Sequence, residues 1–141
     1  MSISQKQALK ELMDLTGEMD LYYKEFNMVT ERPWGYFVVL EDRSSHKLKR
    51  IVVYPGGKLS YQMHRKRDEY WTITKGQGLF TLDGISQYVG PGSTLQIPAG
   101  RKHRISNESD SELEFIEVQL GEYFGEDDIQ RFEDAYGRTD K

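Results

Sequence analysis

The chain has 141 residues and a mass of 16.5 kDa, which is the size of a single domain. It contains no cysteine and only three histidines, which excludes disulfide frameworks, thiolate metal sites and cysteine nucleophiles. Charged residues make up 30% of the chain and the net charge is −4 with a pI of about 5.4, which suits a soluble globular domain and argues against nucleic-acid binding.

The first 30 residues are predicted to form a helical extension. Ser4 and Gln7 have the spacing of a capping box, and Leu9, Leu12 and Met13 share one face of a helix over residues 4–16. We expect this helix to pack on the domain or on a second subunit, and we assign no chemistry to it.

The rest of the chain, residues 31–141, is predicted to form one all-β domain. Short runs of strand-forming residues alternate with Gly- and Pro-containing turns, and this pattern is typical of an antiparallel sandwich or barrel. The predicted strands cover residues 35–40, 47–54, 58–64, 69–74, 79–82, 86–89, 94–97, 103–106 and 113–120. A short C-terminal helix is predicted over residues 127–136, with Ile129, Phe132 and Tyr136 on one side.

Positive charge is concentrated in the middle of the chain. Eight Lys and Arg residues and no acidic residue lie between Arg43 and Arg67, whereas acidic residues dominate from Glu108 onward. Such a stretch either attracts an anionic ligand or covers solvated strand faces. The first ten residues lack the apolar core of a signal peptide, and no apolar run is long enough to cross a membrane, so we expect a cytoplasmic location.

Four residues are candidates for a metal site. Side chains two apart on a strand share a face, so Gln62, His64 and Lys66 point the same way if the strand extends that far. Glu69 begins the next strand, and His103 follows a turn-rich segment. One amide, two imidazoles and one carboxylate are suited to a divalent ion such as zinc, manganese, iron, cobalt or nickel. The predicted metal ligands are therefore Gln62, His64, Glu69 and His103.

These residues fall within two motifs that resemble those of the cupin superfamily. Gly57, His64, Glu69 and Gly76 resemble the motif Gly-x5-His-x-His-x3–4-Glu-x6-Gly, and in this alignment Lys66 stands where cupins usually place a second histidine. The second motif, Gly-x5-Pro-x-Gly-x2-His-x3-Asn, is matched completely by Gly92, Pro98, Gly100, His103 and Asn107. The resemblance implies a double-stranded β-helix (jelly-roll) barrel that holds one divalent metal ion inside.

Further segments resemble the type II phosphomannose isomerase domain over residues 31–138. They include Arg32-Pro33-Trp34-Gly35, the run from Ser60 to His64, Glu69-Tyr70-Trp71, and the segment from Gly125 to Arg138. The resemblance implies interconversion of mannose 6-phosphate and fructose 6-phosphate. In that family the domain often follows a sugar-1-phosphate guanylyltransferase domain, which no part of this sequence resembles, so we expect no guanylyl transfer from this chain. A Gln/His/Glu/His set also resembles the ligands of type I phosphomannose isomerases.

Isomerisation also needs a base and a phosphate-binding group. Glu117 alternates with Phe115 and Gln119, so it is predicted to point into the barrel, where burial would raise its pKa; the alternative is that it faces solvent or pairs with Arg50. Arginine suits phosphate because its planar fork binds two oxygens. We expect Arg131, also a candidate catalytic residue, and Arg138 to bind phosphate, followed by Arg101 and Lys102; Arg50 and Arg67 are equally consistent with structural salt bridges.

Lys66 leaves more than one function open. Its ammonium would repel a divalent metal, so Lys66 is expected to lose its proton, swing away, pair with Glu69 in place of the metal, or contact an anionic substrate or enediolate. The hypotheses are therefore a metal-dependent isomerase with Lys66 in a catalytic role, a non-catalytic cupin that binds a phosphorylated sugar or a protein partner, and another sugar-phosphate or sugar-nucleotide isomerase or epimerase. A homodimer is expected in each case.

Overall fold

The computed structural model describes residue 7 and residues 29–139 of the chain. The predicted helix over residues 4–16 lies outside the described part, residue 7 aside. The compact unit that holds the barrel spans Glu31–Lys141. No helix among the described residues is long and apolar enough to cross a membrane.

Strands make up nearly all of the regular structure that is described. They are β1 (Val29–Arg32), β2 (Gly35–Asp42), β3 (Lys47–Val53), β4 (Tyr61–Met63), β5 (Arg67–Lys75), β6 (Gly78–Leu82), β7 (Ile85–Val89), β8 (Thr94–Ile97), β9 (His103–Ser106), β10 (Leu113–Gly121) and β11 (Gln130–Glu133). All nine predicted strands are present, although β4 is shorter than expected. The prediction of an all-β domain is confirmed.

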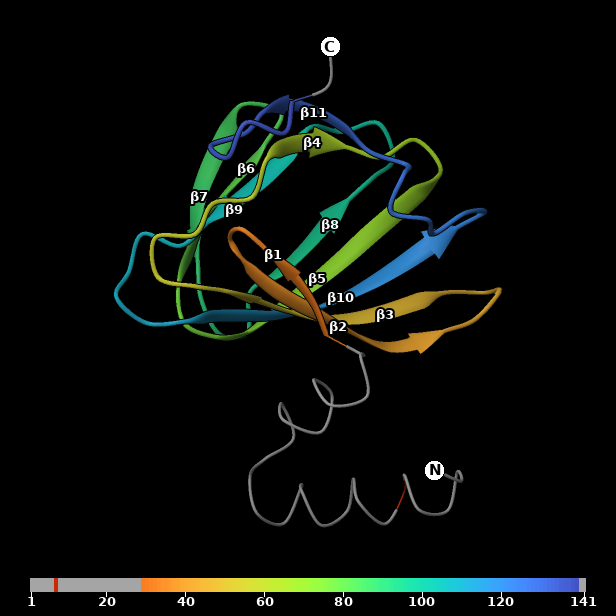
Figure 1. The fold of residues 1–141 in the computed structure, drawn as a ribbon, viewed down its shortest axis with the longest axis horizontal. Helices are drawn as coiled ribbons and strands as arrows, with labels where there is room; N and C mark the ends of the chain where they lie inside the picture. The colour runs from red at the N-terminus through yellow and green to blue at the C-terminus, as the bar shows by residue number, and fades with distance from the viewer. Residues whose placement is uncertain (1–6, 8–28, 140–141) are drawn as a thin grey trace. The chain divides into compact units, whose positions relative to one another are not determined.

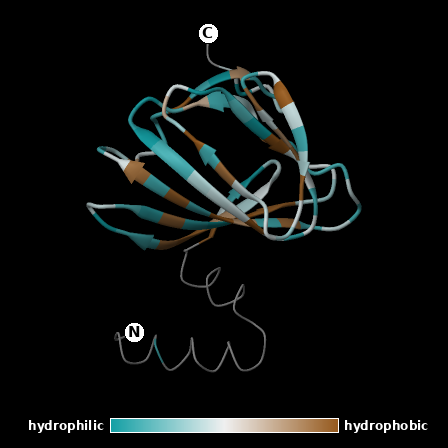
Figure 2. Ribbon diagram, turned by 180° about the vertical axis from the view of Figure 1, so that it is seen from behind, coloured by the Kyte–Doolittle hydropathy of each residue, from teal (hydrophilic) through white to brown (hydrophobic). Residues whose placement is uncertain are grey.

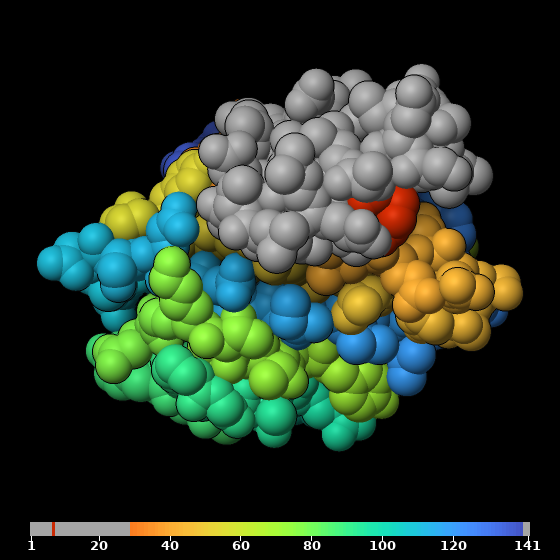
Figure 3. Space-filling view, turned by 90° about the horizontal axis from the view of Figure 1, so that it is seen from below, coloured from red at the N-terminus to blue at the C-terminus, as the bar shows by residue number. Residues whose placement is uncertain are grey.

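The strands form two sheets that enclose the core (Figure 1). The larger sheet has the order β1-β2-β3-β10-β5-β8, and the smaller has the order β11-β4-β9-β6-β7. Sequence neighbours are often separated in these orders: β10 lies between β3 and β5 and pairs antiparallel with both. Figure 3 shows the outer face of the larger sheet, with the side chains of β10 in blue between those of β5 in green and β3 in orange.

Alternation of buried and less buried residues determines which side chains point inward. Apolar and polar segments alternate along the strands, as Figure 2 shows. Trp71 lies at the centre of the core, where its ring stacks on Phe115 with centroids 4.3 Å apart and meets Phe80 edge-on. Truncating either stacked ring to alanine would cost about 3–5 kcal/mol of stability.

The inward face of the larger sheet changes from apolar to polar along its length. On β10, buried Leu113 and Phe115 are followed by buried Glu117 and Gln119. Because the strands are antiparallel, these polar positions lie beside the beginnings of β5 and β3: Glu117 pairs with Trp71 and Lys49, and Gln119 pairs with Glu69. The register therefore gathers the buried polar residues at one end of the barrel.

The expected C-terminal helix over residues 127–136 is wrong, because this segment contains the strand β11. It pairs antiparallel with β4, with Gln130 opposite Met63 and Arg131 opposite Gln62. The spacing of the apolar residues suggested a helix, but β4 has only three residues and pairs with β9 at a single position, Gln62 with His103. Its other edge is free to bond with the C-terminal segment, and that pairing outweighs the local helical pattern.

Gly76, from the first motif, shows why a glycine is needed at one tight turn. Its φ is +77°, and a Cβ there would lie 2.3 Å from the backbone oxygen of Glu112. Only glycine avoids both the strained backbone and the clash.

Candidate metal centre and active site

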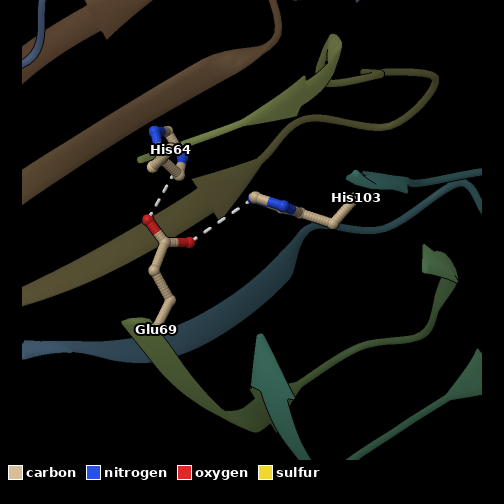
Figure 4. Close-up of side chains that lie close together, drawn as sticks. All are labelled: His64, Glu69 and His103. Carbon is tan, nitrogen blue, oxygen red and sulfur yellow. Dashed lines mark ion pairs between the residues drawn. The ribbon is translucent and has the colours of Figure 1, made fainter. Parts of the chain in front are cut away.

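His64, Glu69 and His103 converge at the polar end of the barrel (Figure 4). All three are buried, and one ligand atom from each lies within 4.8 Å of the others. His64 Nε2 is 3.3 Å from Glu69 Oε2, and His103 Nε2 is 3.5 Å from Glu69 Oε1. The structure therefore brings three of the four predicted ligands together, with His64 and His103 each beside one oxygen of the Glu69 carboxylate.

Gln62, the fourth predicted ligand, lines a cavity that His64 and Glu69 also line. It lies on β4 directly opposite His103, the first residue of β9. Its Oε1 accepts a hydrogen bond of 2.9 Å from the hydroxyl of Ser60, so the amide is held by a neighbour on its own segment. Its oxygen has a second lone pair available for a ligand.

Both histidines are held in the tautomer that suits metal binding. His64 Nδ1 is 2.7 Å from the backbone oxygen of Asp128, and His103 Nδ1 is 3.1 Å from that of Arg101. Because a carbonyl only accepts, each Nδ1 carries the hydrogen, and the lone pair of each Nε2 faces Glu69. His103 Nε2 is buried and has no hydrogen-bond partner in the described part of the chain. This donor set fits a divalent cation.

The charges of the site favour a neutral His64 beside an ionised Glu69. Burial lowers the pKa of His64 to about 4, so its ring is neutral at physiological pH. Burial alone would raise the pKa of Glu69, but it is held well below its ordinary value, and with the His64 ring neutral the positive charge in contact with it is the guanidinium of Arg67. A neutral imidazole nitrogen of His64 and an anionic oxygen of Glu69 are therefore available as ligands.

Arg67 is the cation closest to these ligands. It is buried, and its Nε and Nη2 lie 2.9 and 2.8 Å from Glu69 Oε2, while Nη2 also donates to His64 Nε2 over 3.2 Å. The guanidinium thus contacts two of the atoms that a metal would use. The sequence analysis considered Arg67 only for a structural salt bridge and did not predict its contact with the ligands. Its position two residues before Glu69, on the same strand face, could have indicated this contact.

Lys66 does not line the cavity, and the condition under which it would share a face with Gln62 and His64 is not met, because the strand does not extend that far. Lys66 is exposed, and its Nζ lies 5.3 Å from the centre of the Tyr123 ring. β4 ends at Met63, and the Asp128 carboxylate accepts the backbone N–H groups of Arg65 and Lys66 over 3.0 and 2.9 Å. This turn interrupts the alternation, so that Arg67 rather than Lys66 points inward.

The first motif also fits the sequence better in another alignment. With Gln62 in the place of the first histidine, the chain reads Gly56-x5-Gln62-x-His64-x4-Glu69-x6-Gly76, and every spacing of the motif is satisfied. In this alignment the residue that differs from the motif is Gln62, which replaces the first histidine, and Lys66 occupies a position where the motif allows any residue.

Glu117 faces the same cavity, as predicted. Its Oε1 accepts a 2.9 Å hydrogen bond from Trp71 Nε1, and its Oε2 accepts one of 2.8 Å from Gln119 Nε2. Burial, with a contribution from the negative charge of Glu69, raises the pKa of Glu117 to about 7. The alternative pairing with Arg50 is not found, because Arg50 bonds to Glu114 over 3.1 Å.

The cavity receives some of the predicted phosphate-binding residues but not all. Arg131 and Arg138 line it, together with Arg32 and Lys49, which were not predicted. Arg101 and Lys102 lie elsewhere: Arg101 pairs with Asp83, and Lys102 Nζ is 4.1 Å from the centre of the Phe132 ring. The full lining is Arg32, Trp34, Phe37, Lys49, Ile51, Leu59, Ser60, Gln62, His64, Arg67, Glu69, Trp71, Glu117, Glu126, Ile129, Arg131 and Arg138.

Comparison with known sequences identifies relatives over most of the chain. The family model described as "Mannose-6-phosphate isomerase C-terminal" matches residues 21–134. The alginate biosynthesis protein AlgA of Pseudomonas putida is 37% identical over 94% of this chain and 27% of its own length. The xanthan biosynthesis protein XanB of Xanthomonas campestris pv. campestris and the mannose-1-phosphate guanylyltransferase of Escherichia coli K12 are 44% and 40% identical, each over 77% of this chain and 23% of their own length. The chain thus spans about a quarter of the length of these relatives.

Comparison with solved structures establishes the fold. A protein with a double-stranded β-helix domain from Klebsiella pneumoniae superposes with a TM-score of 0.65 at 16% identity, covering 77% of this chain and 94% of that one. A sugar phosphate isomerase of the cupin superfamily from Silicibacter pomeroyi superposes with a TM-score of 0.61 at 18% identity, covering 81% and 90%. The predicted cupin double-stranded β-helix is confirmed.

Proposed function

The chain belongs to the mannose-6-phosphate isomerase C-terminal family, and on that premise we propose that it interconverts mannose 6-phosphate and fructose 6-phosphate with the help of one divalent metal ion. The observation that carries the proposal is that three predicted ligands, Gln62, His64 and Glu69, line one cavity with the buried carboxylate of Glu117, and that His103 lies beside Glu69. The proposed ligands are Gln62, His64, Glu69 and His103. A metal held there would polarise the carbonyl and hydroxyl oxygens of the sugar.

Glu117 is the proposed base. In the aldose-to-ketose direction it takes the proton from C2, and the C1 carbonyl becomes the anionic oxygen of an enediolate. A proton then passes from O2 to O1, Glu117 returns its proton to C1, and O2 becomes the ketose carbonyl. A carboxylate that is partly ionised near neutral pH is suited to both steps, because it can accept the proton and give it back.

Arginines at the cavity are the proposed groups for the negative charges of the substrate. Arg131 and Arg138 are assigned to the phosphate, with Arg131 also close to the predicted metal ligands through its pairing with Gln62. The guanidinium of Arg138 is oriented by Asp134, whose carboxylate accepts from Nε and Nη2 over 2.8 and 2.9 Å. Arg67, beside Glu69, supplies positive charge near the developing enediolate.

A non-catalytic cupin that binds a phosphorylated sugar is the second candidate. The contact of the Arg67 guanidinium with Glu69 Oε2 and His64 Nε2 favours it, because a permanent cation beside the ligands can substitute electrostatically for a metal. In that case the cavity would bind the sugar phosphate without turning it over.

One combined experiment separates the two functions. The purified protein is analysed for bound metal and assayed for mannose-6-phosphate isomerase activity before and after chelation. The isomerase proposal expects about one divalent ion per chain, turnover that chelator abolishes, and recovery on adding metal back. Stoichiometric metal with no turnover on any hexose phosphate would contradict it, and a metal-free protein that binds mannose 6-phosphate without turnover would support the second candidate.

We further propose that the protein is a homodimer that pairs through β7. This strand lies at one edge of the smaller sheet and contains no charged residue or proline. Its residues Ile85 and Tyr88 are 77% and 78% exposed to solvent. A neutral edge strand has no device against pairing with its own copy. Sedimentation should give a dimer that Ile85→Lys converts to a monomer; a wild-type monomer at micromolar concentration would contradict the proposal.

A further inference from the structure

Lys49 is a buried cation within the polar end of the barrel. It is 3% exposed, it lies on β3 directly opposite Glu117 of β10, and its Nζ is 4.1 Å from the centre of the Phe37 ring. A lysine ammonium removed from water needs a compensating negative group. The aromatic ring provides only part of this compensation.

Glu126 is the carboxylate that pairs with Lys49. The two side chains form a short ion pair, and Glu126 comes from the segment 122–129 that connects β10 to β11. Partial burial opposes ionisation of Glu126, but Lys49, with help from Arg67 and Lys47, holds its pKa below the ordinary value. Glu117 hydrogen-bonds to Trp71 and Gln119 and acts on Lys49 only through space, so the direct ion pair of Lys49 is with the connecting segment.

The pair lies at the cavity. Both residues line the cavity that also receives Arg131 and Arg138. The side chain of Lys49 is 4% exposed, whereas that of Glu126 is 45% exposed, so solvent reaches the pair mainly at Glu126. An anion that enters the cavity would therefore meet Glu126 at the position where it could itself bind Lys49.

The connecting segment has anchors that do not involve this pair. The Phe124 carbonyl accepts from Lys47 over 3.3 Å, and Asp128 holds the turn after β4. The Glu126 side chain can consequently leave Lys49 while the segment on either side of it stays attached.

We propose that Lys49 is an anion-binding residue of the cavity and that Glu126 occupies its place until a phosphate monoester displaces it. The proposal rests on the proposed function only for the identity of the ligand as a sugar phosphate. Exchange of one anion for another keeps Lys49 paired at every stage, so binding does not leave a buried charge uncompensated. Glu126 acts as an internal competitor that weakens binding of stray anions.

Binding of inorganic phosphate and of mannose 6-phosphate tests the proposal without requiring turnover. Trp34 and Trp71 line the cavity, so their fluorescence can report binding. Glu126→Gln should bind both ligands about fivefold more tightly, because the competing charge is gone, and Lys49→Met should bind both at least about tenfold more weakly. Lys49→Arg, which keeps the charge, should retain most of the affinity and serves as a second variant if Lys49→Met does not fold.

Asp127→Asn is the matched control. It removes a charge from the same segment and weakens the bond to Tyr123 without touching Lys49, and it should leave both affinities unchanged. The proposal is overturned if Glu126→Gln binds no more tightly than the wild type, if Asp127→Asn tightens binding as much as Glu126→Gln, if Lys49→Met binds normally, or if the wild type binds neither ligand. If the variants show the expected changes in affinity but the protein has no isomerase turnover, the result would contradict the proposed function and leave the role of Lys49 and Glu126 standing.

Discussion

Glu117 and Glu69 accept hydrogen bonds from the same donor, the indole N–H of Trp71, over 2.9 and 3.2 Å. Two buried carboxylates so close together differ in ionisation: the pKa of Glu69 lies well below its ordinary value and that of Glu117 is raised to about 7. The guanidinium of Arg67 contacts Glu69 directly, whereas burial and the charge of Glu69 raise the pKa of Glu117. The arrangement separates a permanent anion, suited to a metal, from a carboxylate suited to proton transfer.

The first prediction concerns Glu117 and pH. A base acts in its ionised form, so kcat/KM should fall as the pH drops below about 7 and level off above it. Glu117→Gln should lower kcat by about 10²–10⁴-fold and retain the bound metal, because the amide keeps the shape but cannot take a proton. Turnover of the Gln variant within about threefold of the wild type would remove Glu117 from the mechanism.

The second prediction concerns Trp71. Trp71→Phe removes the N–H donor that stabilises the ionised form of Glu117, so the rising limb of the pH profile should move to higher pH. The stacking on Phe115 is retained in part, and thermal unfolding of the variant should remain cooperative. An unchanged or lowered limb, measured from kcat/KM between pH 5 and 9, would show that this hydrogen bond does not control the base.

The third prediction concerns Arg67. Arg67→Met removes the cation that contacts Glu69 Oε2 and His64 Nε2, so the affinity for Mn²⁺ or Co²⁺ should rise by about tenfold or more. Without metal the variant should lose about 3–5 kcal/mol of stability, because Glu69 is left buried with less compensation, and metal should restore much of it. Calorimetric titration and thermal unfolding with and without metal measure both effects. An equal or lower metal affinity would mean that the guanidinium supports the metal site instead of competing with it.

The fourth prediction concerns Lys66. Because its side chain is exposed and directed to Tyr123, Lys66→His should gain neither metal affinity nor isomerase rate. Lys66→Ala should likewise leave both within about twofold of the wild type, as expected for a surface substitution. A second equivalent of bound metal in Lys66→His, or a large loss of turnover in Lys66→Ala, would place this residue back in the site.

The fifth prediction concerns Asp128. Asp128→Ala leaves the N–H groups of Arg65 and Lys66 without their acceptor, which should lower stability by about 1–3 kcal/mol. The turn also sets the position of His64, so metal affinity should fall as well. Asp110→Ala, at an exposed loop position, is the comparison. If stability falls but metal affinity does not, the turn does not position His64.

Much of the fold and part of the site followed from local patterns. Alternation of residue types predicted the nine strands, the inward direction of Glu117 and its raised pKa, and motif spacing predicted His64, Glu69 and His103 as neighbours. These features depend on the period of a strand and on the identity of a few residues, both of which are written in the sequence.

Contacts between distant parts of the chain decided the rest. Asp128 holds a turn more than 60 residues earlier and thereby selects Arg67, not Lys66, for the interior. The free edge of β4 draws residues 130–133 into a strand despite their helical spacing, and Glu126 reaches Lys49 from the same connecting region. The sequence alone determined an all-β barrel, because a strand's inward face repeats every second residue, and its resemblance to the cupin motifs pointed to most of the candidate metal ligands. Only the tertiary structure decided which cations face those ligands, because that depends on where the alternation is interrupted and on what packs against the interruption.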